Sequence, residues 1–269
     1  MPTTESQAAP IVLVHGILGF NQITLGGARL AEYFRLIPEA LRNAGHVVPL
    51  PPHLNPAGSV AERAQDLKNY LQSHSEVAGR KIHLVAHSMG GLDSRFMISK
   101  LGMAGQVLSL TTIGTPHHGS PIADIVVKGS NPVLNKFVEH LGVDINGVFD
   151  LTSDACRKFN DSIPDAPGVR YFSTGGQSEP HRVLGVPQGL LGLTHEIIAK
   201  TEKHNDGLVS VASATMARAG WQALEPWSAN HYRLINWGEN IVPTPLELID
   251  NSVVQKYLGL ADRLRNLGN

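Results

Sequence analysis

Residues 84–91 read LVAHSMGG, in which a serine ends an apolar run and two glycines follow one residue later. Ser88 has the small residue Ala86 two positions before it and Gly90 two positions after it. This spacing is typical of a nucleophile elbow, a sharp strand-to-helix turn that exposes a serine and crowds the flanking positions. Alanine at the first small position, where glycine is usual, is a mild departure. The stretch therefore predicts a strand, a strained turn and a helix, with an exposed serine at the turn.

The overall composition limits the class of protein. The chain has 269 residues, 42% of them hydrophobic, which is enough for one sizeable core, so we expect 1–269 to form a single domain. The formal net charge is −1, with 22 basic and 23 acidic residues, and we expect no nucleic acid as a partner. The single cysteine, Cys156, cannot form an intramolecular disulfide.

No targeting or membrane signal is visible in the sequence. The first ten residues, MPTTESQAAP, lack the basic start and apolar stretch of a signal peptide, and no apolar run is long enough for a transmembrane segment. As given, the expected location is cytoplasmic, and secretion of a longer precursor stays open.

Short apolar runs alternate with segments of helical period. The runs at 11–15, 46–50, 82–86, 107–114 and 169–174 predict strands, and the segments 29–44 and 59–73 predict helices. Because the runs are mostly continuous, both faces of the strands should be covered. The order predicts an α/β fold with a mostly parallel sheet and helices on both faces, and such sheets bind ligands beyond the carboxyl ends of their strands.

The segment 121–165 breaks this alternation with two or three short amphipathic helices. Asn131 and Pro132 form a good helix start, and apolar residues follow at helical spacing: Val133, Leu134, Phe137, Val138 and Leu141. Two interpretations have about equal weight, an ordinary covering helix and a lid over a binding site.

A serine nucleophile needs a base and an orienting acid, which in this fold follow the serine in the order acid, histidine. Chain order removes the histidines before Ser88. His231, in SANHYRLINW, lies in a polar segment near the carboxyl end of the chain, and Asp206, in KHNDGLVS, lies in a turn before an apolar run. We interpret the aspartates within 121–165 as solvated or helix-capping residues. Ser88, Asp206 and His231 are the predicted triad.

An acyl-transfer site also needs donors for the oxyanion of the tetrahedral intermediate. The N–H after the serine, that of Met89, is one candidate, and the loop VHGILGF (14–20) supplies the N–H of Ile17 as the second. Gly16 lets this loop approach the serine, and we expect His15 to have a structural role in it.

Five segments, HGILGF, LVAHSMGGLDSR, LTTIGTPHHGS, NDGLVS and NHYRLIN, follow one another in this order. Together they resemble the α/β-hydrolase true lipases of the bacterial pseudomonad type and their intracellular fungal relatives, from residue 11 to about residue 237. The resemblance implies the α/β-hydrolase fold, with the nucleophile at Ser88, the acid at Asp206, the base at His231 and the oxyanion donors at Ile17 and Met89. It also implies a helical lid within 121–165.

The expected function is that of a serine carboxylic-ester hydrolase, a lipase or esterase that needs no cofactor. Its partner would be a small-molecule or lipid ester such as an acylglycerol, including one presented at an oil–water interface. Two alternatives stay open: a polyester depolymerase, and a catalytically silent scaffold of the same fold that binds a lipid or a protein. The sequence makes no prediction of the oligomeric state.

One position departs from the lipases that the chain resembles. The secreted members carry a calcium ion near the histidine loop, held partly by a carboxylate two residues after the histidine, where this chain has Arg233. An arginine removes a ligand and repels the cation, so we expect no metal. We expect Arg233 to pin the loop by pairing with an upstream carboxylate, with Glu196 as the first candidate.

Overall fold

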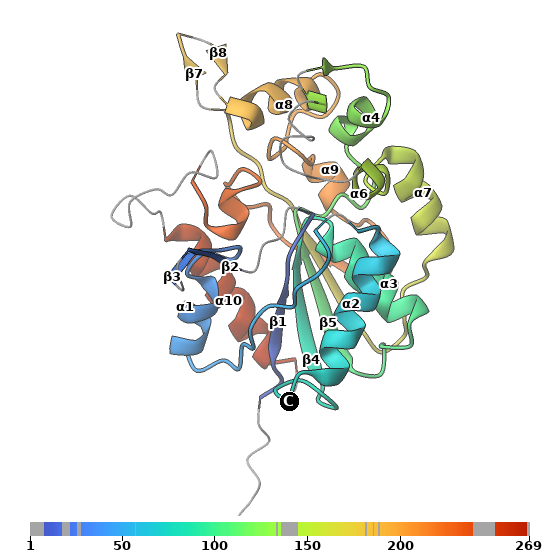
Figure 1. Cartoon of the computed structure of the whole chain (residues 1–269), viewed down its shortest axis with the longest axis vertical. Helices are drawn as coiled ribbons and strands as arrows, with labels where there is room; N and C mark the ends of the chain where they lie inside the picture. The colour runs from blue at the N-terminus through green and yellow to red at the C-terminus, as the bar shows by residue number, and fades with distance from the viewer. Residues whose placement is uncertain are drawn as a thin grey trace, which may run out of the picture.

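The computed structural model describes residues 8–17, 22–25, 28–56, 58–132, 134–135, 145–180, 182–184, 186–187, 189–238 and 251–267. Its centre is a five-stranded sheet, in the order β1-β4-β5-β6-β9, in which all neighbouring strands are parallel (Figure 1). The strands are β1 (Ile11–Val14), β4 (Ile82–His87), β5 (Val107–Ile113), β6 (Arg170–Thr174) and β9 (Trp221–Ala223). The predicted parallel α/β sheet is confirmed.

Helices cover both faces of this sheet, as predicted. One face packs against α1 (Ile37–Asn43) and α10 (Ser252–Arg265), and the other packs against α2 (Val60–Ser73) and α3 (Gly90–Lys100). Successive residues of β1 alternate between the two cores, with Leu13 in the first and Val12 in the second. Both faces are therefore apolar, which explains the continuous apolar runs in the sequence.

Helix α2 begins where the sequence predicts. Ser59 is its N-cap and accepts a hydrogen bond from the Glu62 N–H, while the Glu62 side chain accepts one from the Ser59 N–H, so the two form a capping box. Val60, Ala64, Leu67 and Leu71 are all buried, as their helical spacing indicates.

Two predicted elements are wrong. The segment 29–44 is not one helix, because residues Ala28–Glu32 form strand β3 and α1 begins only at Ile37. Pro38 lies in the first turn of α1, where its missing N–H is not needed, and Leu36 before it has a left-handed backbone that ends any earlier helix. The segment 46–50 forms no strand. Val47 accepts one bond from the Ile11 N–H, but Pro49 has no N–H to continue a ladder.

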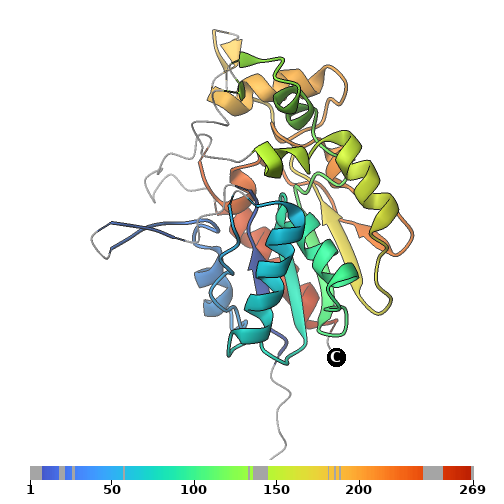
Figure 2. The same cartoon turned by 45° about the vertical axis from the view of Figure 1, so that its right-hand side comes forward.

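A helical cap lies over the carboxyl ends of the strands (Figures 1 and 2). We define it as α4 (Pro121–Val127), α6 (Ile145–Phe149) and α8 (Gly189–Ala199), with α7 (Ser153–Ser162) along its side. Its own small core joins Ile122, Ala123 and Val126 of α4 with Leu134, Val148 of α6 and Ile198 of α8. Leu134 of the predicted apolar stripe is thus buried, whereas Val133, Phe137, Val138 and Leu141 lie outside the described residues.

Among the polar contacts of the cap region, one reaches helix α2 and another joins α4 to α7. The carboxylate of Asp150 accepts a 2.7 Å hydrogen bond from the N–H of Val60, the first residue of α2. Asp124 of α4 accepts bonds from the N–H and the hydroxyl of Ser153 at the start of α7. Asp150 is therefore a capping residue, as predicted for this segment, although it caps a helix 90 residues away in the sequence.

The remaining elements are short. Two hairpins, β2 (Gln22–Leu25) with β3 and β7 (Arg182–Val183) with β8 (Val186–Pro187), project from the body of the protein (Figure 2). The helix α9 (Val211–Ala214) and the 3-10 helix η1 (Arg233–Ile235) follow the two candidate residues Asp206 and His231. In the described part of the chain, no helix combines the length and apolarity needed to span a membrane.

Candidate active site

Ser88 lies on the turn between β4 and α3, at the carboxyl edge of the sheet. Its backbone φ is 55°, a strained value for a residue with a side chain, as an elbow requires. A Cβ added at Gly90 would come within 2.7 Å of the His15 carbonyl oxygen and 2.8 Å of the Val14 carbonyl oxygen. Position 90 therefore has no room for a side chain, because α3 begins directly against the end of β1.

The three predicted triad residues come together although they lie far apart in the sequence. Nε2 of His231 is 3.1 Å from Oγ of Ser88, and Nδ1 of His231 is 2.7 Å from Oδ2 of Asp206. All three residues are buried. Ser88, expected to be exposed at the turn, is only 6% exposed, because it lies at the base of the pocket. Since the carboxylate can only accept, Nδ1 carries a proton and Nε2 is left to accept the serine proton.

The Asp206 carboxylate is held from its other side. Its Oδ1 accepts hydrogen bonds from the N–H groups of Leu208 and Val209, at 2.9 and 2.8 Å. In addition, the His231 N–H donates to the Asp206 carbonyl oxygen at 2.9 Å. The turn NDG therefore fixes both the carboxylate and the backbone of the histidine.

The loop that carries His231 is anchored by its own sequence and by α10. The Asn230 side chain accepts hydrogen bonds from the N–H groups of Tyr232 and Arg233. The hydroxyl of Tyr257 in α10 donates to the Leu234 carbonyl oxygen at 3.0 Å. These contacts limit how far the imidazole can move from Ser88.

The predicted oxyanion donors belong to the two segments that meet at Ser88, the elbow and the loop after β1. Met89 is buried and is the N-cap residue of α3, whereas Ile17 follows β1 and lines the pocket above the serine. A Cβ at Gly16 would be 2.7 Å from Cβ of Ser88, so only glycine lets the Ile17 loop approach this closely. The rest of the quoted loop, residues 18–20, lies outside the described residues.

His15 is structural, as predicted. Its Nδ1 donates to the Gly16 carbonyl oxygen at 2.9 Å and its Nε2 accepts from the Leu54 N–H at 3.1 Å. Burial lowers the pKa of this imidazole to about 3, and the nearby Arg63 adds to the effect. His15 is therefore neutral and holds the loop in place.

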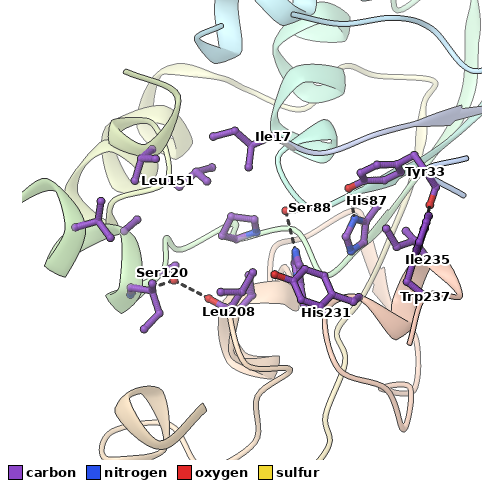
Figure 3. A pocket seen from close by; sticks show the side chains of 17 residues that line it. Ile17, Tyr33, His87, Ser88, Ser120, Leu151, Leu208, His231, Ile235 and Trp237 are labelled. Atoms are coloured by element: carbon purple, nitrogen blue, oxygen red, sulfur yellow. Dashed lines mark hydrogen bonds between the residues drawn. The ribbon is translucent and has the colours of Figure 1, made fainter. Parts of the chain in front are cut away.

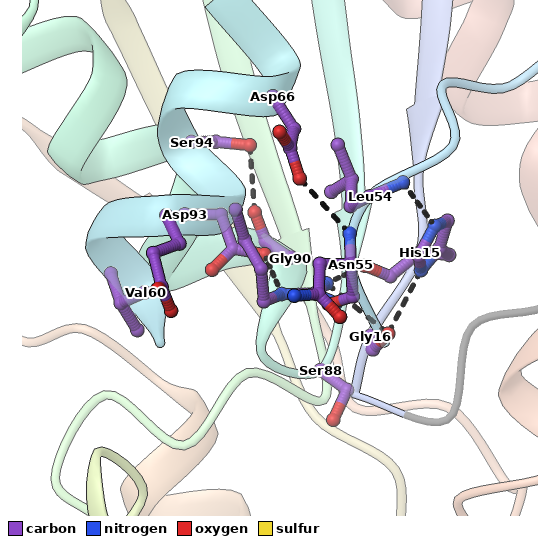
Figure 4. Close-up of polar contacts among 12 residues, drawn as sticks. His15, Gly16, Leu54, Asn55, Val60, Asp66, Ser88, Gly90, Asp93 and Ser94 are labelled. Carbon is purple, nitrogen blue, oxygen red and sulfur yellow. Dashed lines mark hydrogen bonds and ion pairs between the residues drawn. The ribbon is translucent and has the colours of Figure 1, made fainter. Parts of the chain in front are cut away.

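A buried ion pair beneath this loop was not predicted (Figure 4). Arg63 in α2 pairs with Asp93 in α3 at 2.8 Å, with both side chains 0% exposed. The other end of its guanidinium donates to the carbonyl oxygens of His15 at 2.8 Å and Gly16 at 3.2 Å. The sequence does indicate that Arg63 is buried. It stands three residues after Val60 and one before Ala64, so it lies on the apolar stripe of α2.

A second unpredicted contact joins the same loop to the elbow. The hydroxyl of Tyr33 accepts a hydrogen bond from the Gly16 N–H at 2.9 Å and lies 2.7 Å from Nδ1 of His87. Burial lowers the pKa of His87 well below 6.5, and the adjacent His231 lowers it further. The ring centroids of His87 and His231 are 4.6 Å apart, so a neutral His87 avoids placing a second cation beside the base.

An apolar pocket opens above Ser88 and His231 (Figure 3). One wall belongs to the helical cap and the segment after it: Ile122, Ala123 and Val126 of α4, Val148 of α6, and Leu151. The opposite wall is aromatic and aliphatic: Tyr33, Tyr232, Ile235 and Trp237. Figure 3 shows Ser88 between Leu151 on one side and Trp237 on the other, so apolar side chains of the pocket lie on both sides of the serine.

The calcium site of the secreted lipases does not fit the residues near His231. Arg233 begins η1, and Glu196, its suggested partner, forms its ion pair with Arg182 instead, so that pairing is wrong. Across the described ranges, no group of three or more histidine, cysteine, aspartate or glutamate side chains is placed to hold a metal ion.

A parallel sheet covered on both faces, with a serine elbow and an aspartate–histidine pair at its carboxyl edge, defines the α/β-hydrolase class. Over part of the chain, a family described as the PGAP1-like alpha/beta domain matches residues 59–146. Among solved structures, the Staphylococcus hyicus lipase shares the fold with a TM-score of 0.75, at 21% identity over 99% of this chain and 98% of that chain.

Two relatives are closer in sequence. The triacylglycerol lipase of Pseudomonas fragi is 33% identical over 302 residues, covering 96% of this chain and 97% of that protein. Triacylglycerol lipase 2 of Saccharomyces cerevisiae is 32% identical over 230 residues, covering 78% of this chain and 67% of that protein. The chain belongs to the α/β-hydrolase lipase family, as the resemblance implied.

Proposed function

We propose that this protein is a carboxylic-ester hydrolase that cleaves lipid esters such as acylglycerols through an acyl-enzyme on Ser88. The observation that carries the proposal is the pair of contacts at His231, 3.1 Å to Ser88 and 2.7 Å to Asp206, at the base of an apolar pocket. Lipase and esterase activity is also the activity of the family.

In the first half of the reaction, Oγ of Ser88 attacks the ester carbonyl carbon while Nε2 of His231 takes the hydroxyl proton. The carbonyl oxygen becomes an oxyanion and accepts hydrogen bonds from the N–H groups of Ile17 and Met89. Nε2 then gives its proton to the leaving alcohol oxygen as the carbon–oxygen bond breaks. Asp206 stays ionised and stabilises the imidazolium.

In the second half, a water molecule attacks the acyl carbon of the acyl-enzyme. His231 takes a proton from the water and returns one to Oγ of Ser88, which releases the carboxylic acid and restores the free serine. The neutral state of His87 helps this step, because a charged neighbour would oppose protonation of His231.

We further propose that 121–165 acts as a lid within a single domain. The apolar residues of α4 and α6 form one wall of the pocket, so opening the cap would expose them to the substrate phase. An oil phase or detergent favours the opened state, because the exposed apolar surface then no longer faces water.

A fluorophosphonate probe tests the proposal against a catalytically silent scaffold. Labelling of the wild-type protein that disappears in Ser88→Ala supports the enzyme, whereas no labelling supports the binding protein. Rates on p-nitrophenyl esters from short to long chains, on emulsified triglyceride and on a polyester film then separate lipase, esterase and polyester depolymerase. Turnover confined to the film would favour the depolymerase.

A further inference from the structure

Exposed apolar side chains gather at one end of the molecule. Among the described residues, the large apolar side chains that are well exposed are Leu184 at 100%, Phe149 at 53%, Leu50 at 51%, Val183 at 50% and Leu193 at 39%. Leu50 lies beside the sheet, between Val47 and Leu54, which bond to residues of β1 and its following loop. The other four belong to α6, to the β7–β8 hairpin and to α8, at the cap end of the protein (Figures 1 and 2).

The side chain of Leu184 contributes nothing to the stability of the fold. Its side chain is fully exposed and its φ is 49°, in the left-handed region that favours glycine or asparagine over leucine. The hairpin formed by Val183 and Val186 thus carries an apolar residue at its tip despite an unfavourable backbone. A residue whose backbone costs free energy and whose side chain gains none on folding points to a role outside the stability of the fold.

The hairpin is joined to the wall of the pocket. Arg182 at its base forms an ion pair with Glu196 of α8. Helix α8 packs through Ile198 against Ile122 and Val126 of α4, and these two residues line the pocket above Ser88. The hairpin is therefore linked, through α8, to the helix α4 that lines the pocket above Ser88.

We propose that the β7–β8 hairpin, with Val183 and Leu184 as an apolar tip, docks the protein on a neutral lipid surface, and that Leu193 of the adjoining helix α8 extends the contact. This inference rests on the proposed function, because an ester hydrolase with a buried apolar site meets its water-insoluble substrate as such a surface. The Arg182–Glu196 pair adds no net charge at the base of the tip, which fits a neutral acylglycerol surface rather than an anionic membrane. A tip that projects into solvent inserts its side chains without moving the cap.

The test is flotation of the protein with triolein droplets, in a Ser88→Ala background so that no product forms. Leu184→Asn removes the apolar side chain and suits the left-handed backbone, so it should not disturb folding. It should lower the droplet–water partition coefficient roughly tenfold, because one leucine side chain is no longer transferred from water into the oil. Leu184→Phe should retain partition. Leu50→Asn, which replaces a leucine that is 51% exposed beside the sheet, should leave it unchanged.

With Ser88 present, Leu184→Asn should turn over a soluble p-nitrophenyl ester at the wild-type rate and emulsified triolein at a lower rate. Equal flotation of Leu184→Asn and the parent protein would overturn the proposal, as would an equal loss in Leu50→Asn. A wild-type dimer that Leu184→Asn converts to a monomer on a sizing column would also overturn it, since the tip would then bind a second copy. A failure of the proposed function would be seen in a different measurement. The protein would then not hydrolyse the soluble ester, or Ser88→Ala would leave the hydrolysis unchanged.

Discussion

Nη2 of Arg63 donates a hydrogen bond to the carbonyl oxygen of Gly16 at 3.2 Å. The peptide bond between Gly16 and Ile17 is trans, so its N–H points in the direction opposite to the carbonyl. Arg63 and His15 both hold the carbonyl, and they thereby fix the direction in which the Ile17 N–H points. Arg63 is thus a positioning residue for the proposed oxyanion donor, although it does not line the pocket.

Arg63→Lys should lower kcat on a soluble ester by about 10- to 100-fold and change KM little. Lysine keeps a positive charge beside Asp93 but cannot also reach the two loop carbonyls, so the oxyanion donor loses its support while the apolar pocket is intact. Steady-state kinetics with a melting curve measure this. Arg80→Lys is the matched control, because Arg80 also bonds backbone carbonyls, those of Glu76 and Ala8, on the exposed surface. Full kcat in Arg63→Lys would show that the loop is positioned without it.

Replacing the triad residues should give unequal losses. Ser88→Ala and His231→Ala should each lower kcat by about 10⁴-fold or more, and Asp206→Ala should cost somewhat less because the carboxylate orients the imidazole and does not react. Single-turnover and steady-state rates on a p-nitrophenyl ester give the comparison. Asp161→Ala, in an exposed carboxylate of α7, is the control. An Asp206→Ala enzyme with wild-type activity would assign the acid to another carboxylate.

The sequence predicted those parts of the site that are marked by a local motif and by the order of the motifs along the chain. The elbow around Ser88 is a five-residue pattern, and chain order then left few choices for Asp206 and His231. The Arg63–Asp93 and Tyr33–His87 contacts join residues 30 and 54 positions apart, and no local pattern specifies such a pairing. They depend on how α2 and the segment after β3 pack against the end of β1.

The errors in the predicted elements have local causes. The periodicity across 29–44 masked Pro38 in the first turn of α1, and the apolar run at 46–50 masked Pro49, which has no N–H for a ladder. Strand β9 was missed because Trp221–Ala223 is only three residues long. It lies at the edge of the sheet, where a short strand with exposed residues gives a weak apolar signal.

Weakening the contact between the cap and α2 should make the lid easier to open. Asp150→Ala removes the bond from the carboxylate to the Val60 N–H, so activity on a monomeric ester without detergent should rise and its stimulation by low detergent should shrink. Leu134→Asp should change the same ratio, because Leu134 is buried in the core of the cap. The ratio of rates with and without detergent is the readout. A ratio equal to that of wild type in both variants would indicate a fixed cover and favour an esterase.

Stability should fall as the pH drops below about 6.5. Burial lowers the pKa of His15 to about 3 and the pKa values of His87 and His117 well below 6.5, so these imidazoles stay neutral in the folded protein. The unfolded chain takes up their protons near pH 6.5, so it binds more protons and is favoured on acidification, by about 1.4 kcal/mol for each histidine and each pH unit. Their contribution to stability is complete above about pH 7.

Urea unfolding between pH 5 and 8 measures this dependence. His117→Gln should reduce the slope of the unfolding free energy below pH 6.5 by about 1.4 kcal/mol per pH unit, whatever its effect at pH 8. The slope is the informative quantity, because a buried substitution also changes the absolute stability. An unfolding free energy that is constant between pH 7 and 5.5 would contradict the assignment of neutral buried histidines.

Chelation should have little effect on this protein. Arg233 stands where the secreted lipases have a carboxylate near the histidine, and the guanidinium both lacks oxygen ligands and repels a divalent cation. The His231 loop is held by other contacts, the Asn230 side chain and the Tyr257 hydroxyl of α10. Melting temperature and activity should therefore be equal in EDTA and in added calcium. Tyr257→Phe, which removes one of these protein contacts, should lower the melting temperature without creating a calcium response. A large loss of activity in EDTA that calcium restores would contradict the prediction and place a metal site outside the described residues.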